Sequence, residues 1–78
     1  MKKVRITVKN FYTQDILKHI TKYTEANTLK ELLLEQNYHI QDYIIFSEAT
    51  NTFISENNSI ENDMNIVLIN ADGQNNNN

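Results

Sequence analysis

The chain has 78 residues, a formal net charge of −3 and no cysteine. This length allows one domain, near the size at which a single hydrophobic core is only just sufficient. Without cysteine there is no disulfide bond, thiolate metal site or thiol nucleophile, so the domain must fold by packing at least one helix onto a sheet.

The charged residues are unevenly distributed. All seven Lys and Arg residues lie in residues 1–30 with two acids, whereas residues 31–78 hold eight acids and no Lys or Arg. This asymmetry predicts a two-sided molecule able to steer a charged partner, or else the solvated faces of a dipolar but passive protein. Because the total charge is negative, we do not expect a nucleic-acid partner.

The N-terminal segment gives an expectation about location. Residues 1–7 start basic and then alternate polar with apolar residues, without the hydrophobic region of a signal peptide. No apolar run approaches the roughly 20 residues that span a bilayer. We therefore expect a cytoplasmic protein without membrane insertion.

Residues 2–9 alternate between an apolar side and a polar, mostly basic side. The first is Val4, Ile6 and Val8, and the second is Lys3, Arg5, Thr7 and Lys9. Period two with β-branched residues predicts a half-buried strand. Residues 10–15 have turn-forming residues at both ends, which predicts a hairpin connection.

Residues 16–23 fit two structures. A helix would present Ile16, Ile20 and Tyr23 as a stripe. A strand would put Leu17, His19, Thr21 and Tyr23 on one face and Ile16, Lys18, Ile20 and Lys22 on the other. Short strands at a sheet edge often show such mixed patterns, so the neighbouring elements must decide.

A helix is predicted over about residues 28–37. Thr28 and Glu31 have the spacing of a capping box, in which each side chain accepts from a backbone amide at the helix start. The leucines that follow form an apolar face, and we expect the run Leu32–Leu34 to belong to the core. Asn37 fits a left-handed residue at the C-terminal end.

The second half predicts three more strands. Residues 43–46 are aromatic and branched, and residues 52–54 are placed to pair back after a turn at 48–51. A polar loop then holds one apolar residue, Ile60. The nearly continuous apolar run at 65–69 predicts a central strand. Residues 71–78 are expected to form a flexible polar tail.

The predicted order is strand, strand, helix, strand, short strand, strand. We expect the first and last strands to lie in parallel at the sheet centre, which also favours a strand at 16–23. The predicted fold class is α+β: one β-grasp domain over residues 1–70, with a mixed four- to five-stranded sheet and one helix packed across it.

Two stretches resemble the ubiquitin-like superfamily, and most of all the small sulfur-carrier proteins of thiamine and molybdopterin synthesis. TEANTLKELL at 24–33 resembles the passage into the family's helix, and SIENDMNIVL at 59–68 resembles the turn before its last strand. Asn62 stands where that turn usually has glycine, and asparagine tolerates the left-handed conformation.

The resemblance implies a terminal Gly-Gly that an activating enzyme uses, and this chain departs from it. Its single glycine is Gly73, with five residues after it. A carrier or conjugated protein would therefore need processing at Gly73.

No catalytic, metal or cofactor site is expected. His19 and His39 fall on different elements without carboxylates at ligand spacing. Residues 57–63 are polar but lack the glycine and acidic spacing of a calcium loop. We expect a protein that is not an enzyme and that binds no cofactor.

The sheet face opposite the helix is the expected protein-binding surface. An apolar centre from the last strand, ringed by basic residues, suits such a face, although an ordinary solvated face is an alternative. The expected basic residues are Lys3, Arg5, Lys9, Lys18 and Lys22. The leading hypothesis is an adaptor or small subunit; the others are a carrier processed at Gly73 and a nucleic-acid-binding β-grasp domain.

Overall fold

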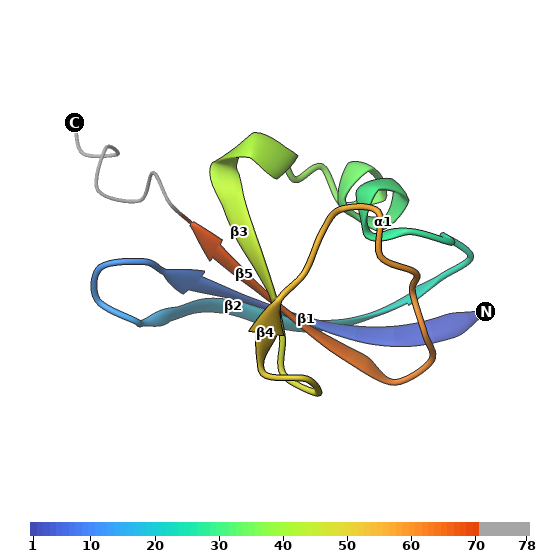
Figure 1. The fold of residues 1–78 in the computed structure, drawn as a ribbon, viewed down its shortest axis with the longest axis horizontal. Coiled ribbons are helices and arrows are strands. Elements are labelled where there is room, and N and C mark those ends of the chain that lie inside the picture. The colour runs from blue at the N-terminus through green and yellow to red at the C-terminus, as the bar shows by residue number, and fades with distance from the viewer. Residues whose placement is uncertain (71–78) are drawn as a thin grey trace.

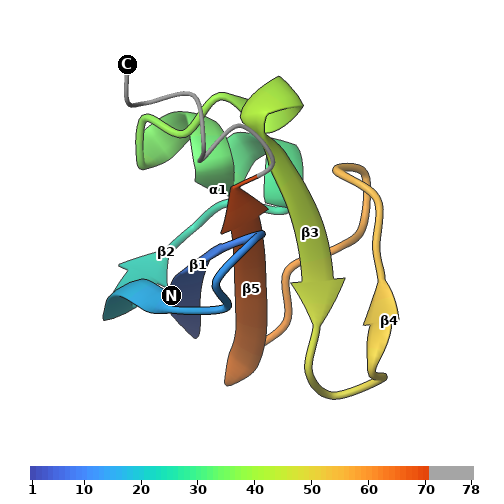
Figure 2. The same ribbon diagram turned by 90° about the vertical axis from the view of Figure 1, so that its left-hand side faces the viewer.

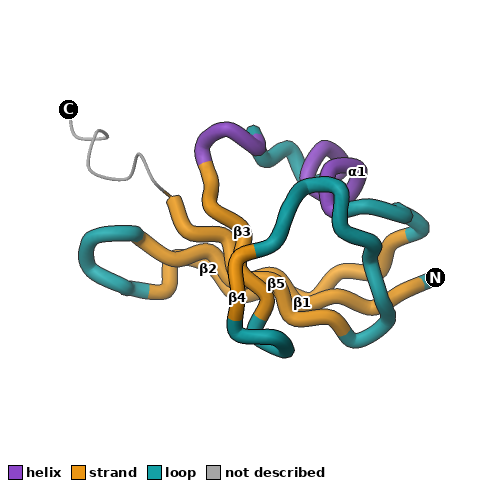
Figure 3. The backbone as a smooth tube through the Cα atoms, in the orientation of Figure 1, coloured by secondary structure: helices purple, strands orange, loops and turns teal. Residues whose placement is uncertain are grey.

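The computed structural model describes residues 1–70 as a sheet with one α-helix on one of its faces (Figure 1). The expected tail at 71–78 lies outside the described residues. In chain order the elements are β1 Lys2–Asn10, β2 Ile16–Thr24, α1 Leu29–Glu35, the 3₁₀ helix η1 Ile40–Asp42, β3 Tyr43–Ser47, β4 Thr52–Phe53 and β5 Met64–Asn70 (Figure 3). Neither helix in this part of the chain is long and apolar enough to cross a membrane.

The sheet has the order β2-β1-β5-β3-β4. Figure 2 shows β5 between β1 and β3, with β2 and β4 towards the two edges. β1 and β5 run parallel, and the other neighbouring pairs run antiparallel. The predicted α+β fold class is confirmed, and the arrangement resembles a β-grasp. Residues 16–23, whose pattern fitted either a helix or a strand, belong to a strand, as the predicted strand order favoured.

The core lies between α1 and the sheet. The predicted inward side of β1 is buried, and β5 adds Ile66 and Leu68 in register with it. Three leucines of α1 close this core from above: Leu29, Leu32 and Leu33. The expectation for Leu34 was wrong, because its side chain is 63% exposed. Leu34 follows two buried positions on a short helix, and the helical turn carries it to the solvent side.

Both helix ends are capped by local hydrogen bonds. The Thr28 hydroxyl accepts from the Glu31 amide at 3.3 Å, and the Glu31 carboxylate accepts from the Asn27 amide at 2.7 Å. At the other end the Asn37 and Tyr38 amides donate to the carbonyls of residues 34 and 33. This Schellman motif needs a left-handed residue, and Asn37 supplies it with φ of 64°. The helix is shorter than predicted and ends at Glu35, but the left-handed conformation predicted for Asn37 is confirmed.

The polar loop 55–62 is anchored to the helix start. Ile60 is buried in the core, as expected for its one apolar residue. The amides of Leu29 and Lys30 donate to carbonyls of residues 58 and 56 at 3.0 and 2.8 Å. The loop therefore satisfies amides that the first turn of a helix leaves without partners.

The turn before β5 differs from the expectation in one residue. Asp63, with φ of 66°, is the left-handed residue there, and Asn62 is not. The Asn62 side chain instead accepts from the Lys3 amide at 2.9 Å. The Asp63 amide donates to the Lys3 carbonyl at 2.7 Å. These two hydrogen bonds hold the turn to the start of β1, and Asp63 is the residue that adopts the left-handed conformation.

Candidate functional site

The register of the strands defines two faces of the sheet. Residues of β1 that pair with Met64, Ile66 and Leu68 face α1, so the intervening residues face away from it. We call this second side the open face. Its residues are Lys3, Arg5, Thr7 and Lys9 on β1, Ile16, His19, Thr21 and Tyr23 on β2, Asn65, Val67 and Ile69 on β5, Ile44 and Phe46 on β3, and Phe53 on β4.

One half of the open face is apolar. Cross-strand neighbours build a continuous surface there, which we call the apolar patch: Ile44, Phe46, Phe53, Val67 and Ile69. The rings of Phe46 and Phe53 meet edge to face, with centroids 5.4 Å apart. Phe53 is 66% exposed, whereas Val67 beside Phe46 is only 5% exposed. The ring of Phe53 is therefore exposed, and Val67 on the other side of Phe46 is already buried.

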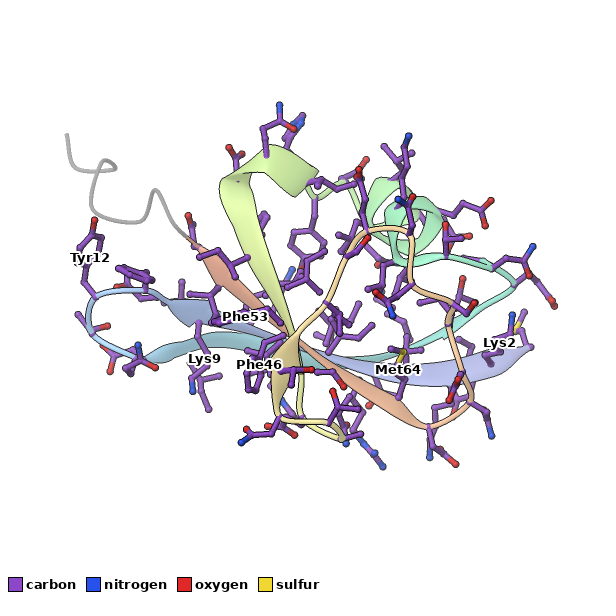
Figure 4. All side chains as sticks on the ribbon, in the orientation of Figure 1. Lys2, Lys9, Tyr12, Phe46, Phe53 and Met64 are labelled. Atoms are coloured by element: carbon purple, nitrogen blue, oxygen red, sulfur yellow. The ribbon has the colours of Figure 1, made fainter. Side chains whose placement is uncertain are left out.

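A shallow groove of about 220 Å³ crosses this patch. Lys9 and Gln14 line one part of it, and Glu48 lies among its apolar residues. Figure 4 shows Lys9 directed away from α1, with Phe46 and Phe53 labelled nearby. The groove is smaller than the usual pockets for small molecules, so it suits one protruding side chain of a partner.

The three basic residues predicted on β1 do lie on the open face. The Lys3 ammonium is 3.4 Å from the Asp63 carboxylate, which offsets its charge. The Arg5 guanidinium donates to the Asn65 side chain at 3.4 Å. Within residues 1–70, Arg5 and Lys9 are therefore the basic residues of β1 on the open face that form no ion pair with an acid.

The two basic residues predicted on β2 lie on the other face. Lys18 pairs with Val8 and Lys22 pairs with Val4, so both share the side that faces α1. The Lys18 ammonium is 5.9 Å from the centre of the Tyr38 ring, which follows α1. The single basic patch expected from five residues is therefore divided between the two faces.

The histidines lie apart from each other. His19 on the open face shares a hydrogen bond of 2.7 Å with the Thr7 hydroxyl, and His39 stands at the start of η1. A second hollow, of about 450 Å³, is lined mainly by polar residues of the loops around 47–50 and 58–63. Glu61 and Asp63 are the acids in its lining. Within residues 1–70 no group of three or more His, Cys, Asp or Glu side chains is placed to hold a metal.

The aromatic part of the site was not foreseen from the sequence. The sequence predicted an apolar centre from the last strand only and did not decide which residues of that strand point away from the helix. The register shows that Val67 and Ile69 do so. Phe46 and Phe53 were expected to lie in strands, but the sequence did not predict which face of the sheet they occupy. The signal that would have found them is their spacing around a short turn, which makes them opposite residues of a hairpin.

The sheet and its apolar patch define a small α+β domain with a β-grasp-like arrangement and one amphipathic sheet face. Neither the protein-family models nor the curated proteins compared with this chain give a match. Gly73, the expected processing site, lies outside the described residues.

Proposed function

We propose that this chain is a non-catalytic protein-interaction module, an adaptor or small subunit, that binds a protein partner through the open face. The observation that carries the proposal is the apolar patch, with Phe53 exposed on the edge strand β4 and Lys9 at its rim. Aromatic residues supply much of the binding energy in protein interfaces, and charged rims steer the approach.

The resemblance to ubiquitin-like proteins, and to small sulfur carriers in particular, belongs to the same proposal. The strand order and the capped start of α1 support it. In this proposal the body of the domain is the part that a partner recognises, so its binding does not depend on the last residues of the chain.

The test is affinity capture from the native host with matched variants. Phe53→Ser removes the exposed ring of the apolar patch, and Leu34→Ser removes a similarly exposed apolar side chain from α1, on the opposite side of the domain. We expect a partner captured by the unchanged protein to bind Leu34→Ser equally. Its dissociation constant for Phe53→Ser should rise about thirtyfold, or about 2 kcal/mol.

Charge reversal tests the rim. Arg5→Glu with Lys9→Glu should weaken the same complex, and Lys30→Glu, which makes a charge change of the same kind on α1, should not. Deletion of residues 72–78 should leave the affinity unchanged. Equal capture of the partner by the unchanged protein and by Phe53→Ser would contradict the proposed role of the open face. Loss of partner binding on deletion of residues 72–78 would favour the carrier hypothesis.

A further inference from the structure

One edge of the sheet is long and uncovered. β2 has nine residues, and eight of its nine positions are exposed or only partly buried. Its backbone is paired with β1 alone, and within residues 1–70 no other backbone hydrogen bond reaches it. The outward N–H and C=O groups of such a strand can pair with another strand. The opposite edge is different, since β4 has only two residues.

The exposed edge carries positive charge and no acid. Lys18 and Lys22 lie on the side facing α1, one on each side of Ile20, because all three pair with inward residues of β1. Residues 16–24 contain no Asp or Glu. The acid that follows the strand, Glu25, lies 3.7 Å from the N-terminal ammonium. A nearby acid of α1, Glu35, accepts a hydrogen bond from the Thr24 hydroxyl at 2.7 Å.

The open side of the same edge is also basic or neutral. His19 and Thr21 lie on that side, and beside them on β1 lie Thr7 and Arg5. An incoming strand therefore meets cations on the side facing α1 and no opposing negative charge on the open side. The edge is complementary to an acidic segment on electrostatic grounds.

A second copy of this chain does not suit the edge in the register that pairs the two whole strands. Ile20 is the middle residue of β2. Antiparallel self-pairing of the whole strand about Ile20 would place Lys18 directly opposite Lys22 of the other copy, twice in each dimer. Like charges directly opposite each other destabilise a sheet.

We propose that β2 accepts an extended acidic segment of a partner protein as a sixth strand of the sheet. The spacing of Lys18, Ile20 and Lys22 sets its pattern: an acid, any residue, an apolar residue, any residue, an acid. The acids pair with the two lysines, and the apolar side chain packs on Ile20, which is itself partly buried against the core. Lys18, Ile20 and Lys22 lie on the side facing α1, away from the apolar patch, so the test of this proposal is independent of the proposed function.

Labelled peptides test the pattern directly. The probe is the blocked peptide Thr-Glu-Thr-Val-Thr-Glu-Thr, and binding is followed by fluorescence anisotropy. One control replaces both glutamates with lysine. A second, Thr-Thr-Glu-Val-Glu-Thr-Thr, has the same composition with the acids on the wrong face. We expect the first peptide to bind at least tenfold more tightly than either control, with an affinity that falls as salt is added.

Variants of the protein test the lysines. Lys18→Glu with Lys22→Glu should abolish binding of the acidic probe and allow binding of the lysine peptide. Lys30→Glu, a single charge reversal on α1, should leave the affinity within a factor of two. The test remains valid even if the double variant is less stable. Binding of the lysine peptide to this variant requires a folded protein, so it shows that the loss of acidic-peptide binding is not due to unfolding.

Hydrogen exchange followed by NMR locates the peptide. Amides of residues 16–24 that exchange rapidly in the free protein should become protected when the acidic peptide binds. Failure of every peptide to bind would mean that the lysines only protect the edge from other strands, and would overturn the proposal. Binding that perturbs Phe53 and Val67 without protecting β2, or a dimer whose β2 amides are protected before any peptide is added, would overturn it as well.

Discussion

Among single residues, Tyr43 shows how a side chain's ionisation reports on folding. It begins β3 on the side facing α1, and its ring meets Tyr38 edge to face with centroids 5.4 Å apart. Burial raises the pKa of Tyr43 above its ordinary value of 10.0, and the nearby Tyr38 and Asp42 raise it further. The folded state therefore favours the neutral phenol.

The expected consequence is a loss of stability in alkali. Because the pKa of Tyr43 is higher in the folded state, its contribution is fully present below pH 10.0 and is lost as the pH rises through the folded-state value. Urea unfolding at a series of pH values measures this slope. Tyr43→Phe should make it shallower, and Tyr23→Phe, at an exposed tyrosine on β2, should not. An unchanged slope in Tyr43→Phe would contradict the assignment.

Among the elements, α1 depends on its surroundings for its stability. It has seven residues, fewer than an isolated helix needs in water. Carbonyl groups of the loop 55–62 accept hydrogen bonds from its first amides, and the caps at both ends satisfy further terminal backbone groups. Its remaining stability comes from packing three leucines on the sheet.

Two neighbouring leucines of α1 give a matched test of this packing. Leu32 is fully buried and Leu34 is 63% exposed. Leu32→Ala should lower the free energy of unfolding by about 2–5 kcal/mol. Leu34→Ala should change it by less than about 0.5 kcal/mol. Urea denaturation of both variants measures the difference. Similar losses in both would mean that helix propensity, and not burial, decides the outcome.

The elements also show what the sequence could and could not predict. Strand and helix positions follow from local patterns, such as the alternation in β1 and the capping box at Thr28. The outward face of β2 does not, because β2 lies at the sheet edge, where Thr24 is its one buried side chain and alternation loses its meaning. An irregular register between Val8 and Lys9 then separates Ile16 from the face of Lys18.

The candidate site was predictable to a similar extent. Arg5 and Lys9 belong to a strand with clear alternation, so their outward direction could be read from the residues. Phe53 belongs to a strand of two residues, which has no period to read. Its place beside Phe46 is decided by pairing across a turn, and this pairing appears only in the structure.

In the whole molecule, strand order turns the charge asymmetry of the sequence into a spatial one. The basic residues of the first 30 positions lie largely on β1 and β2, which form one side of the sheet. Acids of the second half lie partly on the other side, where Asp42 and Glu48 flank β3 and Glu56 follows β4, but Glu35 and Asp63 reach back to Thr24 and Lys3 on the basic side. The β1–β2 side can therefore attract an acidic partner, and this interaction should weaken as salt is added.

The centre of the sheet should be the last part to open. β1 and β5 have paired neighbours on both sides, and their inward residues form the core. We expect the slowest amide exchange in these two strands, around Ile6 and Ile66, with a protection free energy equal to that of global unfolding. Native-state hydrogen exchange by NMR, compared with urea denaturation, measures this. Slowest exchange in β3 or β4 would contradict the expected order.

The parallel pairing of β1 and β5 also decides how the domain responds to mechanical tension. β1 begins at one end of the sheet and β5 finishes at the other (Figure 1). A pull on these two ends therefore acts along the strands in opposite directions. The seven register pairs between Val4–Asn10 and Met64–Asn70 then resist together in shear. A hairpin pulled at its open end separates one pair at a time, whereas this domain, joined to other proteins at both ends, would transmit force between them before it opened.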